Sequence, residues 1–364
     1  MLRLRRSIDL SLRINIQKLL EDSRSQFVFS CYQLFTECHG KSFEYAGGVT
    51  SYWPEATPAS EATRFDIGSL TKVVVTTSLF SLGMAKGEFP LDSHVKQYLP
   101  TLGASWLGTL RIGELLSHSS GLKAWCPIYQ ELGTQTLLEW FASRSDSLRV
   151  GPTRGQAVYS DLNFLLLGLI WESKNERLGK AFEKRVRTPL GMTETSYGPV
   201  PAKDTAATEY SSLKKGPWQG EVFDANAAKL GSECGHAGLF STARSLAPFC
   251  REWLAAVKGK SSWLPQEVAC QMTGPSSLVA QSSWGYGWDT KSPEGSSAGS
   301  EFSSQSFGHL GYPGCSMWID PEKEGFAIFF SNRIHPSRYD ERIRILRPIL
   351  HNAIAEEWKQ SWKS

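Results

Sequence analysis

The chain of 364 residues is long enough for one large two-lobed domain or for two smaller ones. Hydrophobic residues make up 41% and charged residues 21%, which is ordinary for a globular protein. The 39 basic and 36 acidic residues leave a net charge of only +3, without the concentrated basic patch of a nucleic-acid binder, so nucleic acid is not expected as a partner.

Seven cysteines and seven histidines are scattered along the chain. No CxxC pair, HExxH motif or His/Cys cluster occurs, so a zinc site is not expected. The odd cysteine count fits reduced, mostly buried thiols better than a disulfide framework. We therefore expect neither a metal nor an organic cofactor.

Residues 1–26 begin with basic residues, but Asp9, Arg13, Asn15 and Gln17 interrupt the apolar run that a secretory signal would need. The spacing of leucine and isoleucine instead predicts an amphipathic helix packed on the following domain. No stretch of about 18 apolar residues occurs, so no membrane span is predicted. These features predict a cytoplasmic protein, with an organelle-targeting segment as the alternative.

Strand-like runs at 27–35 and 43–49, separated by turn residues, predict a β-hairpin. A helix rich in valine, leucine and methionine is predicted from Ser69 to Lys86. Another is expected at 243–257, with Ser241 as its N-cap. Further helices are predicted at 162–173 and 178–187. After a Ser- and Gly-rich loop, strands are expected at 316–320 and 325–331 and a last helix at 340–358.

Strands near both ends with helices between them predict an α+β fold. The antiparallel sheet would come from residues 27–50 and 300–335 and would be flanked by helices. A mainly helical lobe of about 75–250 would be inserted between these parts. A single catalytic domain would then span 27–360.

The first candidate motif is Ser69-Leu70-Thr71-Lys72, at the start of a predicted helix. A serine hydroxyl is a poor nucleophile at neutral pH and needs a nearby base or cation. Residues three apart share one face of a helix, so the Lys72 amine should reach the Ser69 hydroxyl. The apolar residues that follow should desolvate Lys72 and lower its pKa. The pattern also arises by chance, as a capping serine followed by a surface lysine.

The second candidate motif is Tyr159-Ser160-Asp161, just before an apolar helix. A phenol held near a lysine could carry a proton between the nucleophile and the leaving group. Asp161 would supply an acceptor to the same cleft. Alternatively, Tyr159 is a packed aromatic and Asp161 is the N-cap of the helix that begins near Leu162.

The third candidate motif is His309-Leu310-Gly311, preceded by Gly308. Glycines beside a strand residue let a substrate backbone approach closely. A strand edge there could bind an extended peptide or acyl chain by main-chain pairing. A nearby backbone N–H, together with that of Ser69, would form an oxyanion hole. Taken alone, His309 also fits a structural strand histidine.

In this order, the three motifs resemble the S-x-x-K, Y-x-N and K/H-x-G motifs of the class C β-lactamase, DD-peptidase and esterase family of serine hydrolases. Three further segments, at 110–122, 189–192 and 235–242, resemble other stretches of that family, and the likeness covers about residues 27 to 350. It implies a β-lactamase/transpeptidase-like fold with the site between the sheet and the helical lobe. His118 and His236 look like scaffold positions of that family.

The resemblance also implies roles for individual residues. Ser69 would be the acylated nucleophile, and Lys72 and Tyr159 would share the acid and base roles. Asp161, His309 and Gly311 would bind substrate. Aromatic residues near 125–133 and 284–304, among them Trp125, Tyr129, Trp284, Tyr286 and Trp288, could line the cleft or pack the core.

Two departures from the class C β-lactamases argue against an efficient β-lactamase. Asp161 stands in place of asparagine, so an acceptor-only carboxylate replaces a donor amide. His309 stands in place of lysine, and its pH-dependent charge would weaken an anchor for a substrate carboxylate.

The expected activity is therefore hydrolysis of an ester or a D-amino-acid amide through an acyl-Ser69 intermediate, as in a carboxylesterase or a DD-carboxypeptidase. The substrate would be a small molecule or a short peptide. The alternative is a penicillin-binding sensor or non-hydrolytic binder on the same fold. The oligomeric state is not indicated.

Overall fold

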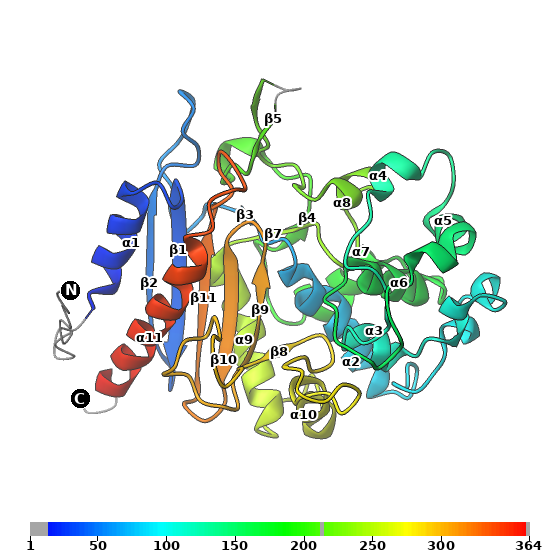
Figure 1. Ribbon diagram of the computed structural model, residues 1–364. Helices are drawn as coiled ribbons and strands as arrows, with labels where there is room; N and C mark the ends of the chain where they lie inside the picture. The colour runs from blue at the N-terminus through cyan, green and yellow to red at the C-terminus, as the bar shows by residue number, and fades with distance from the viewer. Residues whose placement is uncertain (1–13, 212–214, 362–364) are drawn as a thin grey trace, which may run out of the picture.

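One antiparallel sheet joins the two ends of the chain, with six strands in the order β2-β1-β11-β10-β9-β8 (Figure 1). The computed structural model describes residues 14–211 and 215–361. The predicted N-terminal hairpin is present, although its first strand begins four residues later than expected, because Phe27 has a φ of +61° and closes the preceding helix. The strands of this sheet are β1 (Cys31–Cys38), β2 (Lys41–Gly48), β8 (Asp289–Thr290), β9 (Phe307–Gly311), β10 (Cys315–Asp320) and β11 (Gly325–Ser331).

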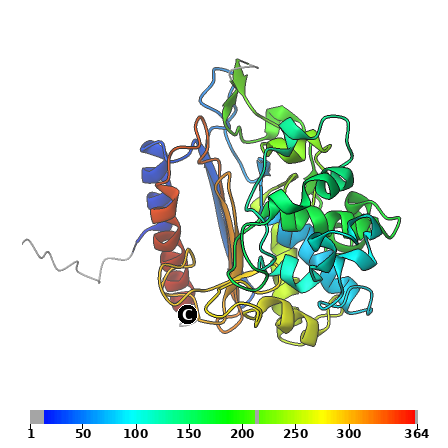
Figure 2. The ribbon, with the colours of Figure 1, turned by 45° about the vertical axis from the view of Figure 1, so that its right-hand side comes forward.

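Helices α1 (Ile16–Ser25) and α11 (Ile343–Ser361) cover one face of the sheet (Figure 2). Leu20 of α1 and Ile354 of α11 are fully buried in one apolar cluster with Phe329 of β11. Burial of each such side chain contributes about 2 kcal/mol. Of the amphipathic helix predicted over 1–26, residues 1–13 lie outside the described residues.

The other face of the sheet is covered by α9 and, beyond it, by a mainly helical lobe built from the middle of the chain (Figures 1 and 2). Central strands β10 and β11 are therefore buried on both faces, which explains their nearly continuous apolar sequences. The α-helices are α2 (Ser78–Met84), α3 (Ile112–Leu116), α4 (Ile128–Glu131), α5 (Leu137–Arg144), α6 (Asp161–Glu172), α7 (Leu178–Phe182), α8 (Ala225–Lys229), α9 (Ala243–Val257) and α10 (Gln266–Thr273). The short 3₁₀ and π segments are η1 (Lys72–Thr77), η2 (Val95–Gln97), η3 (Pro100–Leu102), η4 (Trp106–Thr109), η5 (Ser145–Leu148), η6 (Glu183–Arg187) and η7 (Ala202–Asp204).

Two details of the predicted helices were wrong. The helix expected from Ser69 begins one residue later, at Leu70, passes through the π-helical segment η1 and continues as α2, so Ser69 lies in the turn before it. The N-cap of α9 is Thr242, whose hydroxyl accepts a hydrogen bond from the backbone N–H of Ser245. Ser241 is instead the last residue of a strand, which leaves it unable to cap the helix.

A small second sheet holds the nucleophile turn in place. Strand β3 (Phe65–Asp66) pairs with β7 (Leu239–Ser241), which also pairs with β4 (Ser196–Tyr197). Because β3 runs directly into Gly68 and Ser69, this pairing fixes where the serine emerges. A hairpin of β5 (Tyr210–Ser211) and β6 (Gly216–Pro217) completes the described strands.

The α+β architecture predicted from the sequence is thus confirmed. All seven cysteines are free thiols, and all but Cys270 are buried. Within residues 14–211 and 215–361, no helix combines the length and the apolar character needed to cross a membrane.

Candidate active site

Ser69 lies in a turn where the sheet meets the helical lobe. Only glycine fits at position 68, directly before the serine. Gly68 has a φ of +52°, and a Cβ atom there would lie 2.6 Å from Cδ of Pro313. The Lys72 amine donates a hydrogen bond to Oγ of Ser69 at 2.8 Å. The structure therefore brings together the two side chains of the first predicted motif.

The Lys72 amine is fully buried and has three acceptors. Besides Oγ of Ser69, these are Oδ1 of Asp161 at 2.7 Å and the backbone oxygen of His236 at 3.2 Å. A protonated amine has three N–H donors, so each acceptor has a donor. Burial by itself would lower the pKa of Lys72, but its interactions with Asp161 and Tyr159 together outweigh burial and the pKa is raised. The expectation of a lowered pKa was therefore wrong.

Tyr159 is partly buried beside Lys72, whose amine lies 4.8 Å from the centre of the phenol ring. Burial raises the pKa of Tyr159, although the charge of Lys72 opposes this rise, so the phenol is held neutral. The His118 ring packs 4.6 Å from the Tyr159 ring, and its Nδ1 accepts a hydrogen bond from the backbone N–H of Ser160. His118 thus holds the second motif in place.

Asp161 is the first residue of α6 and not its N-cap, which is Ser160. The N-cap alternative for Asp161 was therefore wrong. Its Oδ1 atom points to Lys72, and its side chain remains 19% exposed.

His309 is buried in β9, with a neutral ring in a defined tautomer. Nδ1 donates a hydrogen bond to the backbone oxygen of Leu310 at 2.8 Å, so Nε2 is an acceptor, and it has no partner in the described residues. Burial and the nearby Lys72 lower the pKa of His309 to about 3. We expected the charge of His309 to change with pH. Because the ring stays neutral near neutral pH, that expectation was wrong.

Gly311 at the end of β9 packs against the backbone that leads to Ser69. A Cβ atom at this position would lie 2.3 Å from the backbone oxygen of Ile67. The next residue, Tyr312, has its backbone nitrogen 3.4 Å from the position a Gly68 Cβ would occupy. Across the described residues, neither the N–H of Ser69 nor that of Tyr312 has an acceptor. These two groups can form an oxyanion hole.

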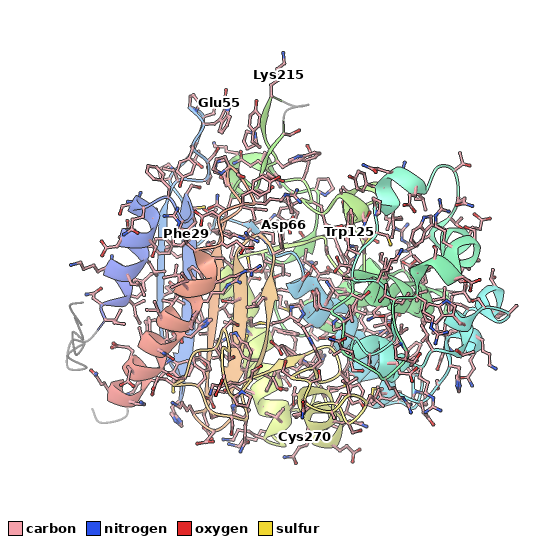
Figure 3. The ribbon with its side chains drawn as sticks, viewed as in Figure 1. Phe29, Glu55, Asp66, Trp125, Lys215 and Cys270 are labelled. Carbon is pink, nitrogen blue, oxygen red and sulfur yellow. The ribbon has the colours of Figure 1, made fainter. Side chains whose placement is uncertain are left out.

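Two cavities meet at Ser69 and Tyr159. The first, of about 400 Å³, contains three carboxyl groups in its wall. Two of its residues, Asp66 toward the sheet and Trp125 toward the lobe, are labelled in Figure 3. The second, of about 490 Å³, contains His309, Trp284 and residues of α11 in its wall. We call them the acidic cavity and the basic cavity, after Asp66, Asp161 and Asp224 in the one and Arg333, Arg344 and Arg347 in the other.

His236 and Asp224 form a pair in the wall of the acidic cavity. Nε2 of His236 lies 3.0 Å from Oδ1 of Asp224. Burial opposes ionisation of Asp224, but His236, the backbone N–H of Ala227 and the charge of Lys72 together outweigh it and lower the pKa of Asp224 to about 2. One ligand-type atom of each of Asp161, Asp224 and His236 lies within 4.8 Å of the others. This geometry could accept a cation, and the Lys72 amine already neutralises one of the two carboxylates.

Sequence reasoning missed Tyr312, Asp224 and Arg347. Tyr312 directly follows the third motif, and this position was the one feature of the sequence that could have indicated its place in the site. The aromatic residues expected at the cleft have two different positions. Trp125 and Trp284 line the cavities, whereas Trp288 is fully buried in the core.

Comparison with known proteins places this site in a family. The Beta-lactamase family model matches residues 39–350. The chain belongs to that family of serine hydrolases. A protein of Escherichia coli (strain K12) named "Putative D-alanyl-D-alanine carboxypeptidase" is 27% identical over 338 residues, which cover 83% of this chain and 76% of the relative. A Salmonella gallinarum protein of the same name is 27% identical over 76% of this chain and 71% of the relative.

Solved structures of the family share the fold at low sequence identity. EstCE1, described as a hydrolase with promiscuous acyltransferase activity, superposes with a TM-score of 0.72 at 18% identity, over 93% of this chain and 97% of its own. A class C beta-lactamase gives a TM-score of 0.70 at 18% identity, over 94% and 96%. The family resemblance drawn from the motifs is confirmed.

Proposed function

We propose that the protein hydrolyses an ester or a D-amino-acid amide through an acyl-enzyme on Ser69. The observation that carries this proposal is the 2.8 Å hydrogen bond from the buried Lys72 amine to Oγ of Ser69, beside two backbone N–H groups that have no acceptor among the described residues. A nucleophile next to a fixed cation and an oxyanion hole is the arrangement that acyl transfer needs.

Lys72 acts as a fixed cation in this mechanism, because Asp161 keeps it protonated. Its charge stabilises the negative charge that develops on Oγ of Ser69 during attack. Tyr159 acts as the proton carrier, since its phenol stays neutral. As Oγ bonds to the acyl carbon, the Ser69 proton passes to the phenol oxygen and the phenol proton passes to the leaving group.

Deacylation reverses the same proton transfers. A water molecule attacks the acyl carbon and its proton passes to the Tyr159 oxygen, while the phenol proton returns to Oγ of Ser69. The N–H groups of Ser69 and Tyr312 hold the carbonyl oxygen in both tetrahedral intermediates. Asp161 and His309 would contact substrate from the two cavities, and Gly311 would let the substrate approach the β9 edge.

The substrate class rests on the relatives. The E. coli relative is named for D-alanyl-D-alanine carboxypeptidase activity, and EstCE1 is described as a hydrolase. Turnover of a short p-nitrophenyl ester should therefore be compared with release of D-Ala from an N-acetylated D-Ala-D-Ala peptide.

Intact-protein mass spectrometry after rapid quenching tests the nucleophile. We expect the wild-type protein to gain the acyl mass of a p-nitrophenyl ester and Ser69→Ala to gain none. Lys72→Met should slow acylation by at least about a hundredfold, whereas Lys86→Met, which removes an exposed lysine, should not. Full hydrolytic activity in Ser69→Ala would overturn the proposal.

Penicillin used as the acyl donor separates the alternatives. A Ser69-dependent adduct that persists would favour a peptidase or a sensor, and turnover of a simple ester would then exclude the sensor. Rapid loss of the adduct with release of hydrolysed drug would show an efficient β-lactamase. Neither adduct nor hydrolysed drug would leave esters and peptides as the substrates.

A further inference from the structure

The two cavities that meet at Ser69 carry opposite charge. In the acidic cavity, Lys72 pairs with Asp161 and Arg338 pairs with Glu209. Asp224 then remains as an ionised carboxylate without a cationic lysine or arginine partner in the described residues, and its side chain is 26% exposed.

The neighbouring groups in this cavity also suit a positively charged ligand. Oδ2 atoms of Asp161 and Asp224 accept no hydrogen bond from the described residues. The ring of His236 is 1% exposed, and its Nδ1 has no hydrogen-bond partner in the part of the chain that the structure describes. Trp125 and Phe223 add aromatic faces, which attract cations.

The basic cavity has the reverse character. Arg347 of α11 is 6% exposed, and its Nη2 donates to the backbone oxygens of Gly311 and Cys315 at 3.3 and 2.8 Å. Its Nε has no partner, and no carboxylate of the described residues forms an ion pair with it. Burial lowers the pKa of Arg347 to about 10, so the guanidinium still carries its charge at neutral pH.

Other charges in the basic cavity do not cancel Arg347. Among the described residues, Arg333 donates only to the backbone oxygens of Tyr312, Arg338 and Asp340. Arg344 pairs with Glu341 at the surface. Burial raises the pKa of Asp289, the acidic residue of this wall, to about 6, so it still carries negative charge at pH 7, but it forms no ion pair within the described residues. A buried cation without a counter-ion is costly, and a bound anion would offset that cost.

We propose that the substrate is an unblocked dipeptide or similarly short zwitterion, with its amino group in the acidic cavity and its carboxylate in the basic cavity. This proposal rests on the function proposed above for Ser69. In a dipeptide, the ammonium belongs to the acyl part and the carboxylate to the leaving amine. The two ends therefore carry the charges that the two cavities complement, with the scissile bond between them at Ser69.

Four matched substrates test the proposal: D-Ala-D-Ala, its N-acetyl form, its C-terminal amide and the form blocked at both ends. We expect each block to lower kcat/KM about 10- to 100-fold, as for loss of a charged hydrogen bond. Equal kcat/KM for all four, or a preference for the N-acetyl form, would overturn the proposal. The same four forms of the L,L dipeptide test whether the charge preference depends on chirality. We expect the preference to hold for them as well.

Two variants show which cavity binds the amino end of the substrate and which binds its carboxylate. Asp224→Asn should bring the ratio of kcat/KM for free over N-acetylated substrate toward one. Arg347→Met should do the same for the carboxylate over the amide. Asp92→Asn and Arg177→Met, which change exposed charges away from both cavities, should keep both ratios. Unchanged ratios in Asp224→Asn and Arg347→Met would overturn the proposal.

Arg347 also holds the end of β9, so a second variant separates charge from position. Arg347→Lys keeps the charge and should keep the carboxylate preference, even if its kcat falls. If the preference is lost in Arg347→Lys as well as in Arg347→Met while both proteins remain folded, the charge is not what recognises the substrate.

Neutral p-nitrophenyl esters distinguish the two proposals from each other. If Ser69 is acylated by the ester but the dipeptides show no charge preference, the zwitterion proposal fails and the Ser69 proposal stands. If Ser69 is not acylated by any substrate, both fail. Activity that requires a divalent metal and disappears with a chelator would also overturn the zwitterion proposal, because Asp161, Asp224 and His236 would then hold the metal.

Discussion

Two buried cations flank the nucleophile, and the fold treats them in opposite ways. Lys72, on the helical-lobe side, has a carboxylate at 2.7 Å and a raised pKa. Arg347, on the sheet side, has backbone oxygens as its acceptors and a pKa lowered to about 10. Burial is nearly complete at both positions, so the counter-ion decides the direction of the shift.

This difference matches what each side of the site must do. Lys72 acts on an atom of the protein itself, Oγ of Ser69, so its charge must be in place before substrate arrives. A built-in counter-ion secures that charge. Arg347 is left with unmet positive charge in the wall of a cavity, which suits a group that binds something from outside.

The largest effect should come from removing the counter-ion of Lys72. In Asp161→Ala, burial alone would act on Lys72, so its pKa should fall below its ordinary value. Breaking a buried pair in this way should cost about 3 kcal/mol of unfolding free energy at pH 7. Acylation by a p-nitrophenyl ester should slow about a hundredfold. Urea unfolding and quenched mass spectrometry measure the two effects.

Asp92→Ala, at an exposed position, is the control for this variant and should stay within about 0.5 kcal/mol of wild type. If Asp161→Ala matched that control in both stability and acylation, the ion pair would not be what maintains Lys72.

Sequence reasoning reached the motifs of the site but not its electrostatics. Ser69 and Lys72 were predictable because three-residue spacing brings two side chains together locally. The pairing of Lys72 with Asp161 bridges 89 positions, and the sequence did not indicate that the carboxylate, together with Tyr159, would outweigh burial. The lowered pKa predicted for Lys72 was wrong for that reason.

The sequence pattern also did not predict which charged residue would be buried. Arg347 lies in a C-terminal helix that was correctly expected, yet nothing in its neighbourhood indicates that this arginine points inward. The strands of the sheet were predictable because β10 and β11 are nearly continuous apolar runs bounded by turn residues. Asp224 escaped notice because α8, the helix that it precedes, is only five residues long.

A smaller effect should follow from removing the second cation. Arg347→Met loses two hydrogen bonds to backbone oxygens but no longer buries a charge. We expect a loss of about 1–2 kcal/mol in unfolding free energy, less than for Asp161→Ala. Urea unfolding at pH 7 measures it, with Arg177→Met as the exposed control. A loss larger than that of Asp161→Ala would mean that the carbonyl contacts of Arg347 matter more than the ion pair of Lys72.

The effect that is smallest at pH 7 concerns His309, a buried group that avoids charge altogether, and this effect grows as the pH falls. Its pKa is about 3 in the folded protein, against about 6.5 in an unfolded chain. Below pH 6.5 the unfolded chain therefore takes up a proton that the folded protein does not. His309 should lower the unfolding free energy by up to about 1.4 kcal/mol per pH unit as the pH falls from 6.5 toward 3.

His309→Gln removes this contribution and should flatten the decline in stability between pH 6.5 and pH 5. Urea unfolding of both proteins at pH 7, 6 and 5 measures the difference. Because His118 and His351 are buried in both proteins, their own acid sensitivity cancels in the comparison. Parallel curves would mean that His309 can be protonated within the fold. It would then supply positive charge to the basic cavity in acid, and Arg347 would no longer be the main cation facing a substrate carboxylate there.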